Sequence, residues 1–155
     1  MNRDNYRKAL ERAMSLCSRS EKCASDIMNK LRSWGMTTVD ENNALLKELV
    51  ENDFINEKRY AEAYTRDKVK FNKWGRYKIR NMLRAKGLSE EDVEHGIRTI
   101  DEEGYREMIE EELRNKKRSL SYKNIIELKA KLVRFASSRG YEKGYVFEIL
   151  EGLNA

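Results

Sequence analysis

The stretch IRNMLRAKGL, residues 79–88, decides the fold, because two similar segments recur elsewhere in the chain. They are DIMNKLRSWGM, residues 26–36, and KLVRFASSRGY, residues 131–141. Each contains a glycine near its end, and the intervals are 52 and 53 residues between Gly35, Gly87 and Gly140. One helical face recurs before each glycine, at Ile27 and Leu31, Ile79 and Leu83, and Leu132 and Ala136. The chain therefore contains an internal repeat of about fifty residues.

Each repeat is predicted to hold three helices. Ten residues after each glycine stands an aliphatic residue: Leu45, Ile97 or Leu150. Thr38 with Glu41, and Ser89 with Asp92, have the spacing of a capping box at a helix start. Apolar residues at helical spacing mark a first helix upstream: Tyr6, Ala9, Leu10, Ala13 and Met14; Tyr60, Ala61, Tyr64 and Phe71; and Tyr105, Ile109 and Leu113.

The predicted fold class is all-α, with three tandem three-helix repeats at residues 1–53, 54–104 and 105–155. Proline is absent, helix-forming residues abound, and strand-like alternation never lasts more than a few residues. A unit of this size has too little core to be stable alone, so neighbouring repeats must share apolar surface. We therefore expect an elongated, curved array that is a monomer.

Several classes of function are disfavoured. No window approaches the roughly 20 apolar residues that span a bilayer, so a cytoplasmic protein without membrane contact is expected. Cys17 and Cys23 are too few for a disulfide framework and are interpreted as small buried residues. The single histidine, His95, stands among glutamates and is expected to be solvated. No catalytic or metal-binding motif is present, so we expect neither an enzyme nor a cofactor.

Charge is distributed in bands along the chain. Residues 54–88 carry eleven Lys or Arg against three Asp or Glu, and residues 113–155 carry ten against four. Residues 89–112 carry two against eleven. The positive bands favour a polyanionic partner. The acidic band either neutralises neighbouring helices of the same chain or faces a basic protein surface.

The most basic stretch is residues 68–88, with eight Lys or Arg, three aromatic residues and no carboxylate. Arg76, Arg80 and Arg84 follow one another at intervals of four, beside the core positions of the same helix. Like charges at that spacing repel unless an anion lies along them, which favours contact with a phosphate backbone or an acidic protein groove; simple solubility is the alternative. Trp74 and Phe71 are interpreted as packing residues, with base stacking as the alternative.

Longer stretches resemble the RecX family of recombinase regulators. NDFINEKRYAEAYTRDKV, residues 52–69, followed by GRYKIRNMLRAKGLSEEDVEHGI, residues 75–97, resembles the family's most characteristic segment. LCSRSEKCASDIMNKLRSWG, residues 16–35, and KLVRFASSRGYEKGYVFEIL, residues 131–150, are similar to its first and third units. The resemblance covers nearly the whole chain.

The resemblance implies an inhibitor that binds the RecA–DNA filament in its groove and limits ATPase activity, strand exchange and filament growth in DNA repair and the SOS response. It also implies weaker binding to single- and double-stranded DNA. The expected contact residues are Lys68, Lys70, Lys73, Arg76, Lys78, Arg80, Arg84, Lys86, Lys129, Lys131, Arg134 and Arg139. A general DNA-binding helical module and a helical scaffold for an acidic protein remain alternatives.

Overall fold

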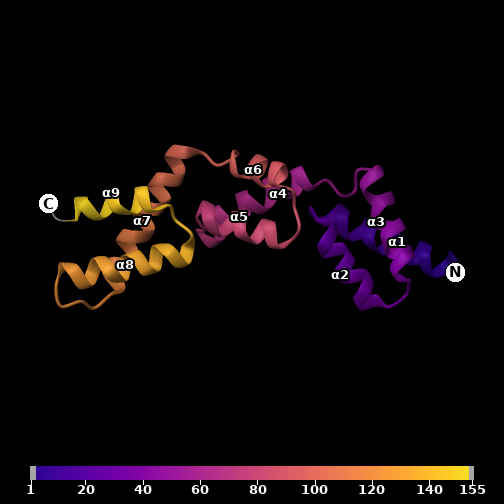
Figure 1. Cartoon of the computed structure of the whole chain (residues 1–155), viewed down its shortest axis with the longest axis horizontal. Helices are drawn as coiled ribbons and strands as arrows, with labels where there is room; N and C mark the ends of the chain where they lie inside the picture. Colours follow the sequence, from indigo (N-terminus) through magenta and orange to yellow (C-terminus); the bar gives the residue numbers. More distant parts are fainter. Residues whose placement is uncertain (1–2, 154–155) are drawn as a thin grey trace. The chain divides into compact units, whose positions relative to one another are not determined.

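The computed structural model describes residues 3–153, and helices dominate it (Figure 1). The elements are α1 (Arg3–Arg19), α2 (Ala24–Trp34), α3 (Val39–Glu51), α4 (Glu57–Asp67), the π-helix η1 (Lys68–Asn72), α5 (Arg76–Ala85), α6 (Glu90–Ile97), α7 (Glu102–Ser119), α8 (Ile125–Arg139) and α9 (Lys143–Gly152). Residues 3–153 contain no strand, so the predicted all-α class is confirmed. Residues 1–2 and 154–155, at the ends of the first and third predicted repeats, lie outside the described residues.

The chain divides into two compact units. The first comprises Met1–Ala63 and Leu83–Gly96, and the second comprises Tyr64–Met82 and Ile97–Ala155. Helix α5 supplies residues to both, because the division falls between Met82 and Leu83. The boundaries of the three repeats stay a prediction.

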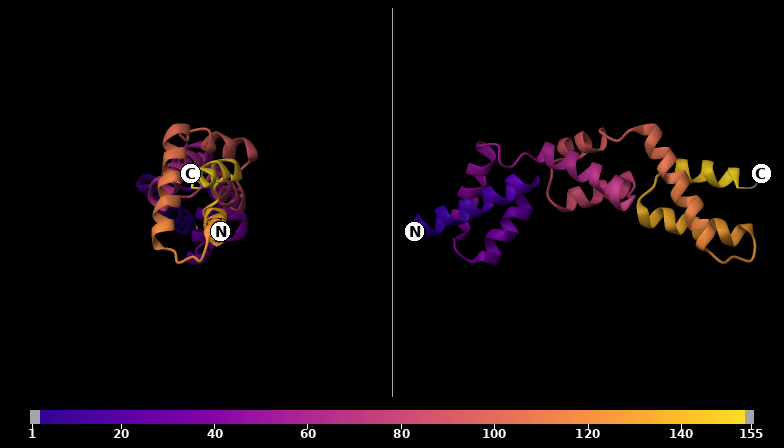
Figure 2. Two further views of the ribbon diagram at one scale, coloured as in Figure 1. Left: turned by 90° about the vertical axis from the view of Figure 1, so that its left-hand side faces the viewer. Right: turned by 180° about the vertical axis from the view of Figure 1, so that it is seen from behind.

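In the first unit, α1, α2 and α3 lie against one another around an apolar core (Figure 2). Its buried residues are Ala9, Ala13, Ile27, Leu31, Leu45, Leu49 and Ile55. Tyr6 lies beside this core and donates its hydroxyl proton to Glu48 at 2.9 Å. The repeated positions read from the sequence are therefore core positions here.

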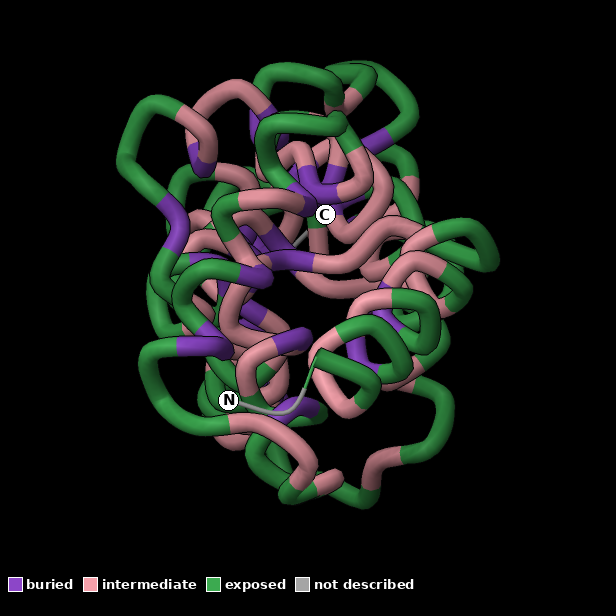
Figure 3. The backbone as a smooth tube through the Cα atoms, turned by 90° about the vertical axis from the view of Figure 1, so that its right-hand side faces the viewer, coloured by how far each residue is buried: buried purple, intermediate pink, exposed green. Residues whose placement is uncertain are grey.

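In the second unit, α7, α8 and α9 form the corresponding three-helix group. Its core comprises Tyr105, Ile109, Leu113, Leu128, Leu132, Ala136, Tyr141, Val146 and Leu150. Buried positions alternate with exposed ones along each helix, as the burial colouring shows (Figure 3). The spacing is that of amphipathic helices, each burying one stripe.

Helix ends follow the predicted signals. Gly35, Gly87 and Gly140 have φ of 64°, 90° and 86°, the left-handed conformation that ends many helices and that glycine adopts without strain. The capping box of Thr38 and Glu41 is present at the start of α3. The Ser89 hydroxyl accepts a hydrogen bond from the Asp92 amide at 3.1 Å before α6. These three features of the predicted repeat are confirmed.

Among the helices of residues 3–153, none is both long enough and apolar enough to cross a bilayer.

Candidate nucleic-acid and partner interface

The basic segment begins with a π-helix that the sequence did not predict. Helix α4 runs directly into η1, and Lys73 then adopts a left-handed conformation with φ 56°. The amides of Lys73 and Trp74 both donate to the Lys68 carbonyl oxygen, which closes the widened turn. A π-helical turn is rare, often marks a functional site, and here is followed by a positive φ that non-glycine residues seldom adopt.

Trp74 is half-buried, and its ring lies near the ammonium groups of two lysines, one earlier and one later in the sequence. Lys68 Nζ lies 4.9 Å and Lys78 Nζ lies 4.6 Å from a ring centroid of Trp74. Tyr64 meets the same ring edge-on, with centroids 6.3 Å apart. Cation–π attraction fixes both lysine head groups here. Trp74 thus packs within the second unit, as the packing interpretation expects.

Phe71 behaves differently from Trp74. It is 70% exposed, with Lys70 Nζ 5.3 Å from its ring centroid. The prediction that Phe71 packs on the same face as Tyr64 is wrong. A π-helix bonds each amide one residue further back than an α-helix does, so residues in η1 turn away from the buried side of α4.

The start of α5 docks on the turn that follows α8. Hydrogen bonds cross the contact, among them Gly75 N to Arg139 O at 2.6 Å, Tyr77 N to Gly140 O at 3.1 Å, and Tyr141 Oη to Lys73 O at 2.6 Å. Burial raises the pKa of Tyr141 to about 12, so its hydroxyl keeps the proton that it donates. Lys78 Nζ also donates to the Ser138 carbonyl oxygen at 3.3 Å. The segment 73–78 is therefore held by backbone contacts.

The sequence predicted an exposed stripe of Arg76, Arg80 and Arg84, but Arg76 is not exposed. Its side chain is only 14% exposed, and its Nη1 and Nη2 lie 2.6 Å from Glu142 and 2.5 Å from Glu102. The guanidinium also covers the ring of Tyr105 at 4.3 Å from the centroid. Burial alone would lower the pKa of Arg76, but hydrogen bonds to Glu142 and Glu102 raise it. The expectation of an exposed side chain is wrong, because two carboxylates of the same unit pair with it.

Arg84 and Lys86 belong to the first unit and are also paired. Arg84 makes a forked contact with Glu90, at 2.7 Å from Nε and 3.0 Å from Nη2. Lys86 Nζ lies 2.9 Å from Asp26.

In the acidic band, residues 89–112, Glu90 therefore pairs with a base of its own chain. Three further glutamates of the band do the same: Glu91 with Lys58, Glu102 with Arg76, and Glu112 with Arg139. These pairs favour the interpretation that the band neutralises neighbouring helices.

The Lys86–Asp26 pair predicts a loss of stability in acid. Burial acts to raise the pKa of Asp26, but hydrogen bonds from Lys86 and Cys23 bring it below its ordinary value. A lowered folded-state pKa gives stabilisation that is present above the unfolded-state value, about 3.9, and is lost as the pH falls through the folded value. We expect Asp26→Asn to cost about 1 kcal/mol at pH 7 and to flatten the acid limb of the stability curve. Denaturant unfolding between neutral and acid pH measures this.

Asp4→Asn is the matched control, because Asp4 lies 3.8 Å from Arg7 with its side chain 77% exposed. An Asp26→Asn curve that falls in acid as steeply as that of the Asp4→Asn variant would contradict the assignment.

The predicted contact residues of α8 do not share one face. Lys131 pairs with Glu127 at 3.1 Å and donates to the Ser121 carbonyl oxygen, and Arg139 pairs with Glu112 at 2.9 Å. Arg134 is exposed and Lys129 is half-buried, and within residues 3–153 neither forms an ion pair. At about 100° per residue, Lys131 and Arg134 lie about 60° apart around the helix, whereas Lys129 lies about 140° or more from both.

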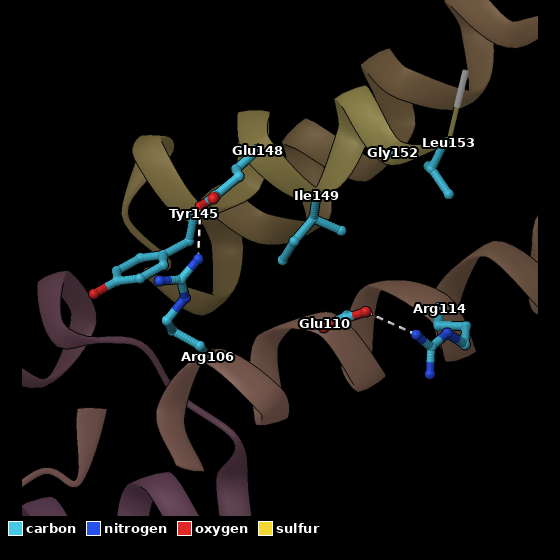
Figure 4. Close-up of a pocket in the computed structure, with 8 residues that line it drawn as sticks. All are labelled: Arg106, Glu110, Arg114, Tyr145, Glu148, Ile149, Gly152 and Leu153. Atoms are coloured by element: carbon cyan, nitrogen blue, oxygen red, sulfur yellow. Dashed lines mark hydrogen bonds and ion pairs between the residues drawn. The ribbon is translucent and has the colours of Figure 1, made fainter. Parts of the chain in front are cut away.

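A groove of about 400 Å³ lies between α7 and α9 in the second unit (Figure 4). Its two arginines are already paired, Arg106 with Glu148 and Arg114 with Glu110, each at 2.8 Å. Ile149 supplies part of its apolar wall. None of the predicted contact residues lines it.

The residues considered for catalysis or metal binding have local roles. His95 Nε2 lies 2.5 Å from Glu62, so the expectation of a merely solvated histidine is wrong. Burial raises the pKa of both Cys17 and Cys23, which keeps them as thiols; Cys23 is fully buried and Cys17 half-buried. Across residues 3–153, no three His, Cys, Asp or Glu side chains gather into a group that could hold a metal ion.

Comparison with known proteins confirms the resemblance to the RecX family. Residues 56–97 match the family described as RecX, second three-helix domain. A regulatory protein RecX from Clostridium acetobutylicum is 27% identical over 156 residues, which cover 96% of this chain and 70% of that protein. Relatives such as this one are named regulatory proteins.

Two solved structures have the same fold. One, described as regulatory protein RecX, gives a TM-score of 0.85 at 23% identity, covering 96% of this chain and 74% of that one. RecX from Lactobacillus salivarius gives 0.76 at 23% identity, covering 97% of both chains.

Proposed function

We propose that this chain, whose similarity to the RecX family is confirmed, regulates the RecA recombinase by binding the RecA–DNA filament. In this proposal it lies in the filament groove as an inhibitor of ATPase activity, strand exchange and filament growth, and it binds bare DNA more weakly. The observation that carries the proposal is the match of residues 56–97, which contain the whole basic segment at residues 68–88, to a RecX domain.

The distribution of charge supports a polyanionic partner. Residues 68–88 hold eight bases and no carboxylate, and the described structure places Lys70 in an exposed position there. Arg134 is exposed on α8 and Lys129 is half-buried. Because these three bases make no ion pair within residues 3–153, they can meet a phosphate or carboxylate without first breaking one. Of the three, Lys70 and Arg134 are also exposed to solvent.

The deciding experiment measures RecA ATPase activity on single-stranded DNA with and without this protein. Inhibition at protein concentrations well below those that saturate bare DNA is expected. A general DNA-binding module would instead bind bare DNA with the same affinity as the filament. A scaffold for an acidic protein would bind neither, whereas any phosphate binder should show a log-salt slope of about −0.7 to −0.9 per neutralised phosphate.

The triple variant Lys70→Ala, Lys129→Ala, Arg134→Ala is expected to raise the half-inhibitory concentration tenfold or more, because each charge-assisted contact is worth about 1.5–3 kcal/mol. Its unfolding midpoint should match that of the unsubstituted protein. The control variant Lys47→Ala removes a base from α3 that is paired only at 4.0 Å to the exposed Glu51. Equal inhibition by both variants would contradict the proposed contacts.

A further inference from the structure

We propose that Phe71 is a stacking platform for an unpaired nucleic-acid base, with the lysines around it holding the adjoining phosphates. This inference rests on the proposed function in one respect, since it names the single-stranded nucleic acid as the ligand of the basic segment. The observation that carries it is an exposed aromatic ring on a π-helical turn, among lysines and fixed by the fold.

The exposure of Phe71 has no packing explanation. At 70% it is among the most exposed large apolar side chains between residues 3 and 153, although α4, which runs directly into η1, contains the buried Tyr60 and Ala61. The change from α4 to η1 at Lys68 is what turns the ring outward. A rare backbone conformation thus places an apolar ring in solvent. An exposed apolar side chain beside charges that complement a ligand indicates a binding site.

Charge around the ring is of one sign. The segment 68–74 contains Lys68, Lys70 and Lys73 and no acid, and its one acidic neighbour before Lys68 is Asp67. Lys70 Nζ lies 5.3 Å from the Phe71 centroid, while Lys68 Nζ is held against Trp74. A base laid on Phe71 would bring its phosphates close to the Lys70 ammonium group.

The surface selects a single strand over a duplex or an acidic protein. A duplex keeps its bases stacked inside, so an exposed phenylalanine gains nothing from its phosphates. An acidic protein offers carboxylates but no series of planar rings. A single strand offers both, and aromatic stacking with a basic groove is the general mode of binding it.

Trp74 is not the platform, because its ring is half-buried and meets two lysines and a tyrosine, whereas Phe71 is 70% exposed with one lysine near its ring. The ammonium groups of Lys68 and Lys78 lie within 5 Å of its ring centroids, and Tyr64 meets its edge. Trp74 instead orients these two lysines. The fold fixes the segment from both ends: the Lys68 carbonyl accepts the Trp74 amide, and the Lys73 carbonyl accepts the Tyr141 hydroxyl. Phe71 therefore meets its ligand with little backbone ordering left to do.

The test is equilibrium binding of the full chain to a labelled oligothymidine strand over a range of salt concentrations. Phe71→Ala is expected to weaken binding about tenfold with an unchanged log-salt slope, because it removes stacking but no charge. Phe71→Trp should restore the affinity. Lys70→Ala should make the slope shallower. Phe147→Ala is the matched control, since Phe147 is 53% exposed on α9, and it should bind normally.

Strands with abasic positions separate stacking from other effects. The unsubstituted protein should lose affinity on an abasic strand about as much as Phe71→Ala loses on the normal one, and Phe71→Ala should be indifferent to the change. Normal binding by Phe71→Ala, or equal losses for both proteins on abasic strands, would overturn the inference.

RecA ATPase inhibition is measured separately. Stacking without inhibition refutes the proposed function alone, and inhibition without an effect of Phe71 on DNA binding refutes this inference alone.

Discussion

Gly75→Ala is expected to destabilise the second unit by about 3 kcal/mol or more. A methyl group on Gly75 would lie 2.2 Å from the carbonyl oxygen and 2.4 Å from the carbonyl carbon of Gly140. Both sides of this contact are backbone, so no side chain can rotate to relieve the overlap. The start of α5 and the turn after α8 would have to separate.

Separation would break the hydrogen bonds that cross the contact. The Gly75 amide donates to Arg139 at 2.6 Å and the Tyr77 amide donates to Gly140 at 3.1 Å. Each is worth about 1 kcal/mol net, and more where a buried donor is left without a partner. The overlap adds an overpacking cost of about 1–3 kcal/mol. The two effects are linked, because moving the segments apart to relieve the overlap breaks the hydrogen bonds.

Unfolding by denaturant, followed by the fluorescence of Trp74 in a Trp34→Phe background, reports on the second unit. Trp74 precedes Gly75 in the chain, whereas Trp34 belongs to the first unit. Gly144→Ala is the control, because a methyl group there meets nothing within 4 Å, and it should stabilise α9 by about 0.5–1 kcal/mol. Similar midpoints for Gly75→Ala and Gly144→Ala would refute the close contact.

The sequence predicted the glycines that end helices, because those follow a local rule. Gly35, Gly87 and Gly140 each stand after a helical face that repeats, and all three have the left-handed conformation. The role of Gly75 follows no such rule. Glycine is required at position 75 because the backbone of Gly140, which is distant in sequence, lies against it. No periodic pattern in the sequence indicates this contact.

The candidate interface was predictable in composition but not in detail. The distribution of charge located the basic segment, and a helical wheel with about 100° per residue correctly separated Ile79 and Leu83, which are fully buried, from the arginines. The wheel could not show that carboxylates far along the chain reach Arg76. It also assumed an unbroken α-helical period, so it missed the π-helical turn that exposes Phe71.

Arg76→Ala is expected to destabilise the second unit by about 2–3 kcal/mol, although the sequence predicted this arginine as a contact for a partner. Removing one partner of a largely buried ion pair leaves the other charge without a partner. Here that charge is Glu142, whose side chain is only 19% exposed. Glu102 is 58% exposed and water can solvate it, which keeps the expected cost below the 3–5 kcal/mol of a fully buried pair. Loss of the cation–π contact with Tyr105 adds to the effect.

Arg84→Ala is the comparison, because Arg84 belongs to the same predicted stripe but its side chain is 47% exposed and its partner Glu90 is 66% exposed. Its unfolding midpoint should stay close to that of the unsubstituted protein. Arg76→Lys keeps the charge but loses the planar fork that reaches both glutamates, so it should fall between the two. A double-mutant cycle of Arg76→Ala with Glu142→Ala should show a coupling of about 1–3 kcal/mol. If Arg76→Ala unfolds at the same denaturant concentration as Arg84→Ala and only RecA inhibition declines, then Arg76 is the exposed contact of the stripe after all, and its pairing with Glu142 contributes nothing to the fold.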